Sequence, residues 1–189
     1  NQSDYTITEV SYANYKVVDS RNSLYVFVEG PTWEEAEANA QKLGGHLVSI
    51  NSEDENNFIL DLLDKSNNNV IWIGYTDKTG GLDGQQWEWV DGSTSTYENW
   101  NQNSTHSPND PEPNDTSSQQ TYAEMYSTKY DQLQQGSQVP GTWNDMYNDD
   151  FYWGNISQGI AEIPYVRYGN SAYVIVEGPT WEEAEANAV

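Results

Sequence analysis

The chain of 189 residues contains no cysteine. This absence excludes disulfide bonds, thiol nucleophiles and zinc–thiolate sites. Basic residues are scarce as well, because 7 lysines and arginines stand against 30 acidic residues, for a net charge of −23 (7 − 30 = −23). Such a surface repels phosphate backbones and anionic lipid, so nucleic acids and membrane surfaces are poor partners.

Aliphatic residues and long apolar runs are also rare. No stretch approaches the ~20 consecutive apolar residues that cross a bilayer, so no membrane insertion is expected. Leu, Ile, Val and Phe make up 33 of the 189 residues, a share typical of disordered chains at this net charge. The 8 tryptophans and 14 tyrosines compensate, because each buries more area than a valine. We therefore expect a folded chain in which bound divalent cations reduce the repulsion between acidic groups.

A repeat defines the organisation of the chain. Residues 24–40 read LYVFVEGPTWEEAEANA and residues 172–188 read AYVIVEGPTWEEAEANA, with fifteen of the seventeen positions identical. The repeat predicts a tail or linker at 1–21, one complete unit at 22–165, and a linker with the truncated start of a second tandem copy at 166–189. The second copy lacks the partners that would bury Trp181 and its strand. It is therefore available for self-association, including exchange with the first strand.

Capping and periodicity signals predict the elements of the complete unit. A strand at 24–29 precedes a Thr32–Glu35 capping box that begins a helix at Trp33, and a second box, Ser52 with Glu55, begins another helix. Further strands are predicted at 47–50, 70–75, 87–90, 122–126, 141–146 and 159–163. Residues 93–120 are rich in Asn, Asp, Ser and Pro, which is typical of a functional loop. Two early helices followed by a strand-rich half indicate the α+β class.

Oxygen-bearing side chains gather in two segments. The long loop contains Asp110-Pro111-Glu112-Pro113-Asn114-Asp115, and Trp143-Asn144-Asp145 follows further along the chain. Carboxylates and amide carbonyls are the hard ligands that calcium takes in sets of ~6–8. The prolines on both sides of Glu112 restrict its backbone and lower the entropy lost on binding a ligand. A cis bond between Glu112 and Pro113 would let the flanking side chains point toward one ion.

Five segments, in this order, resemble the C-type lectin-like domain over roughly residues 23–165. Residues 32–59 resemble the family's two-helix opening, Ile71–Gly74 its core strand and Gly159–Ile163 its closing strand. The Glu-Pro-Asn and Trp-Asn-Asp triplets resemble the two halves of its calcium and sugar site. The resemblance implies the C-type lectin-like fold, with two helices, small antiparallel sheets and a long calcium-binding loop.

The resemblance also implies the site residues. It places Ca²⁺ on Glu112, Asn114, Asn144 and Asp145, with Gln120 as the fifth ligand and Glu124 as the alternative in that role. Two neighbouring hydroxyls of a sugar would coordinate the same ion beside Glu112, Asn114 and Asn144, and Glu-Pro-Asn implies mannose, glucose, N-acetylglucosamine or fucose-type sugars. His106, in the loop, is a further candidate for sugar contact or an exposed loop residue. Asp77 and Asp115 partly match an accessory metal site, and Ala40 and Ala161 stand where the family has one cysteine pair.

The resulting hypothesis is a calcium-dependent carbohydrate-binding module that serves adhesion in a larger extracellular or cell-surface protein. Its partners would be glycans, and the lack of cysteine favours a bacterial surface protein. The alternative is a calcium-stabilised protein-interaction or spacer domain that binds no sugar. No enzyme is predicted, because the sequence has no His-Glu-x-x-His, no Gly-x-Ser-x-Gly and no glycine-rich phosphate loop.

Overall fold

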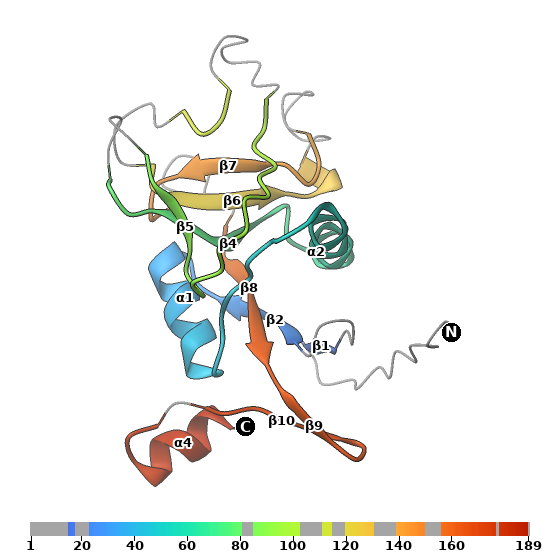
Figure 1. Cartoon of the computed structure of the whole chain (residues 1–189), viewed down its shortest axis with the longest axis vertical. Helices are drawn as coiled ribbons and strands as arrows, with labels where there is room; N and C mark the ends of the chain where they lie inside the picture. The colour runs from blue at the N-terminus through green and yellow to red at the C-terminus, as the bar shows by residue number, and fades with distance from the viewer. Residues whose placement is uncertain are drawn as a thin grey trace.

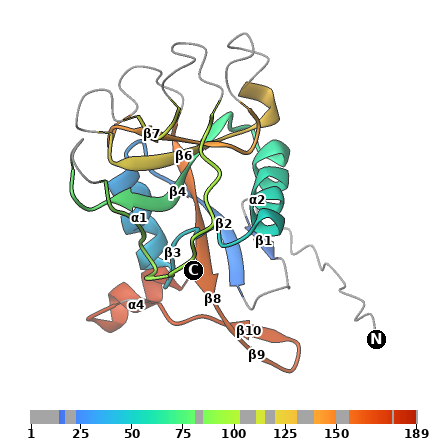
Figure 2. The same cartoon turned by 45° about the horizontal axis from the view of Figure 1, so that its top comes forward.

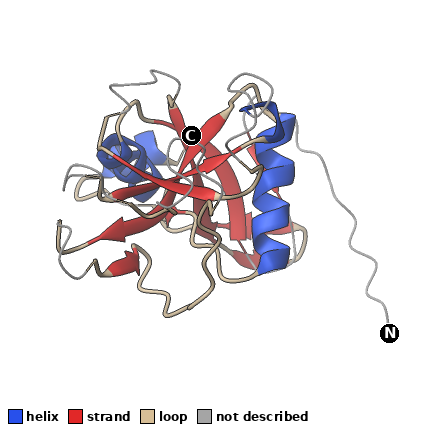
Figure 3. Cartoon of the chain, turned by 90° about the horizontal axis from the view of Figure 1, so that it is seen from above, coloured by secondary structure: helices blue, strands red, loops and turns tan. Residues whose placement is uncertain are grey.

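The computed structural model describes residues 15–17, 23–80, 85–102, 111–114, 120–130, 139–149, 156–176 and 178–188. Within these ranges a mixed sheet runs through the centre of the molecule, with helix α1 (Trp33–Lys42) and helix α2 (Glu53–Lys65) on either side of it (Figures 1 and 3). The α+β class predicted from the sequence is confirmed.

The two helices begin where the capping signals place them. The Thr32 side chain accepts a hydrogen bond from the Glu35 backbone N–H at 3.1 Å, and the Ser52 side chain accepts one from the Glu55 N–H at 3.3 Å. The carboxylates of the two boxes have other partners than the cap N–H: Glu35 Oε2 accepts from the Thr32 hydroxyl at 2.9 Å, and Glu55 Oε2 accepts from the Asn51 N–H at 2.8 Å. Each cap satisfies one of the N–H groups that a helix start leaves without a backbone partner.

Pairing between the first and last strands of the unit closes the domain. The strands are β1 (Tyr15–Val17), β2 (Ser23–Glu29), β3 (His46–Leu47), β4 (Val70–Asp77), β5 (Trp87–Trp89), β6 (Tyr122–Tyr126), β7 (Trp143–Met146) and β8 (Gln158–Pro164). They follow the order β1-β2-β8-β4-β6-β7, with β3 on β8 and β5 on β4. β2 and β8 are antiparallel from Ser23 opposite Pro164 to Glu29 opposite Gln158. The unit therefore starts and ends at the same place on the sheet.

β1 lies within the segment that the sequence assigned to a tail or linker. Tyr15 pairs with Val26 and Val17 with Leu24, so β1 extends the sheet beyond β2. A strand of three residues carries too little alternation to be predicted, and its pairing is supplied by the free edge of β2.

The core consists of two buried clusters, one under each helix. The cluster under α2 contains Ile59, Leu62, Leu63, Trp89, Trp100 and Trp143, and the cluster under α1 contains Trp33, Ala36, Ala40, Leu47, Trp72 and Ala161. Ala40 and Ala161 are both fully buried in the second cluster. Close apolar packing between α1 and β8 therefore occupies the place of the cysteine pair that the resemblance implied.

The second copy of the repeat lies outside both clusters. It begins in β10 (Ser171–Tyr173), which forms a hairpin with β9 (Val166–Tyr168), and it continues into helix α4 (Trp181–Asn187). The hairpin and α4 lie below the rest of the molecule (Figure 2). Trp181 is 73% exposed, and α4 buries none of its residues. The second copy therefore exposes most of the apolar side chains that the first copy buries. None of the helices in the described ranges is both long and apolar enough to cross a membrane.

A pair of glutamates lies where β2 meets β8. The Tyr25 hydroxyl is 3.2 Å from Glu162 Oε1 and 3.3 Å from Glu55 Oε1. Burial raises the pKa of Glu162, and the charges of Glu55 and Asp91 raise it further, against the hydrogen bonds from Ser23 and Tyr25 that lower it. The folded protein therefore holds a proton on Glu162 more tightly than the unfolded chain does.

This raised pKa gives stability that is fully present below the unfolded pKa and is lost as the pH rises through the folded value. The Glu162→Gln variant cannot ionise, so we expect its free energy of unfolding at pH 7 to exceed that of the wild type by about 1 kcal/mol, a typical size for one substitution. The gain should shrink toward pH 4. Urea unfolding at both pH values measures it, with the exposed Glu88→Gln as the matched control. An equal effect of Glu162→Gln at both pH values would contradict this account.

Candidate functional site

The site is built on the pairing of β6 with β7. Glu124 lies opposite Asn144 and Ala123 opposite Asp145 in this pair. Trp143 precedes them and is fully buried, and its indole Nε1–H donates to Asn56 Oδ1 on α2 at 2.9 Å. Trp143 thus fixes the position of the strand from beneath, and the two polar residues after it are held at the sheet.

The Glu112 segment is tied to the same strand through Asn101. The Asn101 N–H donates to the Trp143 carbonyl at 2.8 Å, and the Glu112 N–H donates to the Asn101 carbonyl at 3.0 Å. The Gln102 side chain adds a hydrogen bond to the Glu112 carbonyl at 3.2 Å. The bond between Glu112 and Pro113 is cis. Sequence reasoning missed Asn101 and Gln102, because neither carries a ligand motif and Asn101 acts through its backbone.

A hydrogen-bond network joins the two triplets. The Asn114 N–H donates to Asp145 Oδ1 at 3.1 Å. The Asp145 carbonyl accepts from Gln120 Nε2 at 3.3 Å and from Asn144 Nδ2 at 2.9 Å, and Asn144 Nδ2 also lies 2.9 Å from Glu124 Oε1. The structure therefore brings Asn114, Gln120, Asn144 and Asp145 together with Glu124. Glu112 is held near these residues by the hydrogen bond of its N–H to the Asn101 carbonyl, and it lies two residues before Asn114 in the sequence.

The acidic groups of the site are buried. Glu112 is 8% exposed, Glu124 3% and Asp145 0%. Between residues 79 and 166 the sequence has a single lysine or arginine, Lys129. Its ammonium group donates to the Ser66 carbonyl at the end of α2. Because a buried carboxylate is costly unless it is compensated, this concentration of negative charge favours a bound cation.

The pKa of the Tyr126 hydroxyl reflects the same buried, negatively charged environment. Burial raises the pKa of its hydroxyl well above the ordinary value, and the charge of Glu124 raises it further, as do Tyr130, Glu112 and the hydrogen bond to Glu124. Tyr126 therefore stays protonated and donates to Glu124. Glu124 is thus engaged by both Tyr126 and Asn144, whereas Gln120 is half-buried beside the Asp145 carbonyl.

The donor set suits a hard divalent cation. The set consists of the carboxylates of Glu112 and Asp145 and the amide groups of Asn114, Gln120 and Asn144. Within the described ranges no group of three or more His, Cys, Asp or Glu side chains could hold a metal ion, so amide oxygens would have to complete the coordination. A mixed set of carboxylate and amide oxygens is the kind that calcium accepts at ~6–8 positions.

Asp77, a candidate ligand of the accessory metal site, forms hydrogen bonds within the connection between β4 and β5. Its Oδ1 accepts hydrogen bonds from the Thr79 N–H at 3.0 Å, the Thr79 hydroxyl at 2.8 Å and the Gln86 N–H at 2.9 Å. These contacts join the two ends of the connection between β4 and β5. Asp115, its proposed partner, and His106 both lie outside the described residues. The accessory metal site and the sugar contact of His106 remain predictions.

The fold and the site together define a lectin-type binding domain. Residues 29–150 match the family model for the lectin C-type domain, and the chain belongs to this family, which is one of non-enzymatic binding domains. A "Lectin" from Pleurodeles waltl is 32% identical over 133 residues, which cover 68% of this chain and 65% of that protein. The "Type-2 ice-structuring protein" of Hemitripterus americanus is 39% identical over 77 residues, 41% of this chain and 43% of that protein.

The carbohydrate-recognition domain of cow CD23 has the same fold. The two structures superpose with a TM-score of 0.55 at 24% identity, over 88% of this chain and 100% of the CD23 domain. The matches with the two relatives span 65% and 43% of those proteins. The comparisons thus assign the family and the fold, and the particular ligand has to come from the site.

Gln120→Glu tests the fifth ligand. A carboxylate in place of the amide adds a negative charge to the donor set, so we expect calcium affinity to rise about tenfold, or ~1.4 kcal/mol. Isothermal titration with CaCl₂ measures the change. Gln119→Glu adds the same charge one position away and should have a smaller effect. An unchanged affinity in Gln120→Glu together with lost binding in Glu124→Gln would assign the role to Glu124 instead.

Proposed function

We propose that this chain is a calcium-dependent carbohydrate-binding module. The observation that carries the proposal is the junction of two distant triplets, in which the Asn114 N–H contacts Asp145 Oδ1 and Asn101 links Glu112 to β7. This junction gathers buried carboxylates and amides in one place. The Pleurodeles lectin, similar over two thirds of the chain, supports carbohydrate binding in general.

The side chains of the two triplets would recognise a pair of neighbouring hydroxyls. Bound Ca²⁺ would supply coordination positions for both sugar oxygens. Glu112 as a carboxylate can only accept a hydrogen bond, whereas Asn114 and Asn144 can also donate. Each hydroxyl can therefore donate its proton to a carboxylate and receive an N–H from an amide. We propose that this arrangement selects the equatorial 3- and 4-hydroxyls of mannose, glucose, N-acetylglucosamine and fucose-type sugars.

A single contact of this kind binds weakly, so its use depends on multiplicity. Linked copies raise the effective concentration of a second site and increase avidity without any new contact. The repeated segment at 172–188 is consistent with such an array. We therefore propose a role in adhesion to extracellular glycans, in a protein at the cell surface. The lack of cysteine favours a bacterial source.

A second candidate is a calcium-stabilised domain that binds a protein or serves as a spacer. The similarity to an ice-structuring protein supports this candidate, because the name of that relative describes a function other than sugar binding. In this case the calcium ion would set the shape of the loop and no sugar would enter. Such a domain would unfold at a lower temperature after chelation, yet show no competition by monosaccharides.

A glycan array probed with calcium and with chelator tests the leading proposal. We expect signals on mannose, glucose, N-acetylglucosamine or fucose-bearing glycans that disappear when EGTA is added. Free mannose should compete for the bound protein. If calcium raises the unfolding temperature but no glycan gives a chelator-sensitive signal, the second candidate is supported instead.

The double variant Glu112→Gln/Asn114→Asp tests the role of the first triplet. It exchanges the positions of the carboxylate and the amide, so the total charge is conserved while the pattern of donors and acceptors is reversed. We expect affinity for mannose-type sugars to fall at least about tenfold, or ~1.4 kcal/mol, with galactose-type binding gained. The melting temperature in calcium should change little. Asp149→Asn, an exposed residue beyond the second triplet, is the control, and unchanged sugar preference in the double variant would contradict the model.

A further inference from the structure

Every side chain that is buried in the first copy of the repeat has an identical counterpart in the second copy. The buried residues of the first copy are Tyr25, Val26, Val28, Trp33, Ala36, Glu37 and Ala40, and the second copy has the identical residues Tyr173, Val174, Val176, Trp181, Ala184, Glu185 and Ala188. The copies differ only where Leu24 is replaced by Ala172 and Phe27 by Ile175, and both first-copy positions are half-buried. Every fully buried contact of the first copy is therefore available to the second.

The second copy also has the same local geometry as the first. The cap Thr32 has φ −114° and ψ 154°, and Thr180 has φ −119° and ψ 161°. The Thr180 side chain accepts from the Glu183 N–H at 3.2 Å, as Thr32 does from Glu35. A Cβ on Gly178 would lie 2.4 Å from the Ala184 nitrogen, and one on Gly30 would lie 2.3 Å from the Ala36 nitrogen. The turn and helix that pack against the sheet in the first copy are thus already formed in the second.

The two copies differ in burial. Trp33 is 6% exposed and its indole donates to the Ile73 carbonyl at 2.8 Å, whereas Trp181 is 73% exposed. Ile175 is 85% exposed. The second copy is a formed element with an apolar face that the described residues leave mostly open to solvent.

The path of the chain allows the second copy to reach the place of the first. β2 begins with Ser23 opposite Pro164, the last residue of β8. For Ala172 to take the position of Leu24 opposite Ile163, residues 164–171 would have to form a loop between two neighbouring strands. Adjacent strands are only ~4.8 Å apart, so a loop of this length is sufficient. The exchange breaks the short pairing of β10 with β9, but it needs no separation of β8 from β4 or β3.

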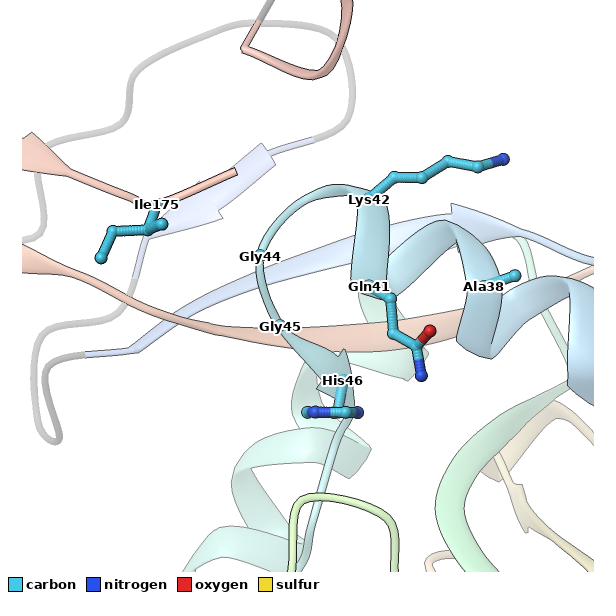
Figure 4. Close-up of a pocket in the computed structure, with 7 residues that line it drawn as sticks. All are labelled: Ala38, Gln41, Lys42, Gly44, Gly45, His46 and Ile175. Carbon is cyan, nitrogen blue, oxygen red and sulfur yellow. The ribbon is translucent and has the colours of Figure 1, made fainter. Parts of the chain in front are cut away.

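The second copy already lies beside α1. The Ile175 carbonyl approaches Gly44, where a Cβ would lie 1.7 Å from this oxygen, and Gly44 has a φ of +82°. Ile175 and the end of α1 enclose a pocket of about 470 Å³ that is also lined by Ala38, Gln41, Lys42, Gly45 and His46 (Figure 4). The incoming segment is therefore a neighbour of the segment that it would replace.

We propose that residues 172–188 can replace residues 24–40 on β8 of the same chain, which gives a second, circularly permuted arrangement of the domain. In this arrangement α4 packs where α1 packs now, and residues 1–40 are released. Leu24 and Phe27 bury more apolar surface than Ala172 and Ile175, so the arrangement in the structure is the major one. The residues of the proposed sugar site lie on β6, β7 and the loops before them, so both arrangements retain them.

Ala36→Asp tests the exchange in the chain of residues 1–189. Ala36 is fully buried against Gly30, and a charged side chain cannot be accommodated there. We expect Ala36→Asp to remain folded, because the second copy supplies Ala184 at the same position. The matched Ala184→Asp variant should unfold like the wild type, and Ala36→Asp/Ala184→Asp should lose cooperative unfolding. If Ala36→Asp alone is unfolded, or if the double variant is as stable as Ala36→Asp, the proposal is wrong.

Hydroxyl-radical footprinting shows which copy is buried. Cleavage after Arg21, Lys42 and Arg167 places Trp33 in the peptide 22–42 and Trp181 in the peptide 168–189. In the wild type we expect Trp181 to be oxidised several-fold faster than Trp33, and in Ala36→Asp this order should be reversed. Light scattering should show a monomer in both. An unchanged order would overturn the proposal, and so would a dimer, because the second copy would then sit on another molecule.

Discussion

The antiparallel pairing of β2 with β8 is the interaction on which the rest of the domain depends. A chain without cysteine has no covalent link between its first and last strands, so seven residue pairs from Ser23–Pro164 to Glu29–Gln158 hold them together. β8 can serve as the centre because two of its residues, Gly159 and Ala161, are small. A Cβ on Gly159 would lie 2.4 Å from Leu47 Cδ2, and Ala161 packs in the same cluster as Ala40. A larger side chain at either place would separate α1 and β3 from the sheet.

The same sheet carries the site into a region of concentrated negative charge. β4 connects β8 to β6, and β6 pairs with β7, so the position of Asn144 and Asp145 is set by the closed frame. The scarcity of lysine and arginine that disfavours nucleic acid partners also leaves the carboxylates of the site with few basic neighbours along the sequence. Folding alone therefore gathers like charges at some cost. In our proposal a bound cation relieves this repulsion, and fold stability and ligand binding become linked.

The fold was largely predictable because its signals are local. Capping residues such as Thr32 and Ser52 mark the two helix starts, and alternation or continuous apolar character marks the strands. The candidate ligands could be named because residue type decides what can bind a hard cation. The parts that were missed depend on tertiary partners. β1 exists because β2 has a free edge, Asn101 acts through its backbone, and the Glu55 carboxylate binds Asn51 in place of its own cap.

In our proposal the two copies of the repeat compete for β8, which has room for one of them. Replacing Leu24 by alanine and Phe27 by isoleucine removes about six carbon atoms at half-buried positions, which corresponds to ~2 kcal/mol at ~0.8 kcal/mol per fully buried carbon. A difference of this size is a ratio of roughly 30 between the two arrangements. The remaining buried residues are identical and cancel in the comparison. In our proposal, two substitutions at half-buried positions therefore decide which copy is packed on β8 and which is released.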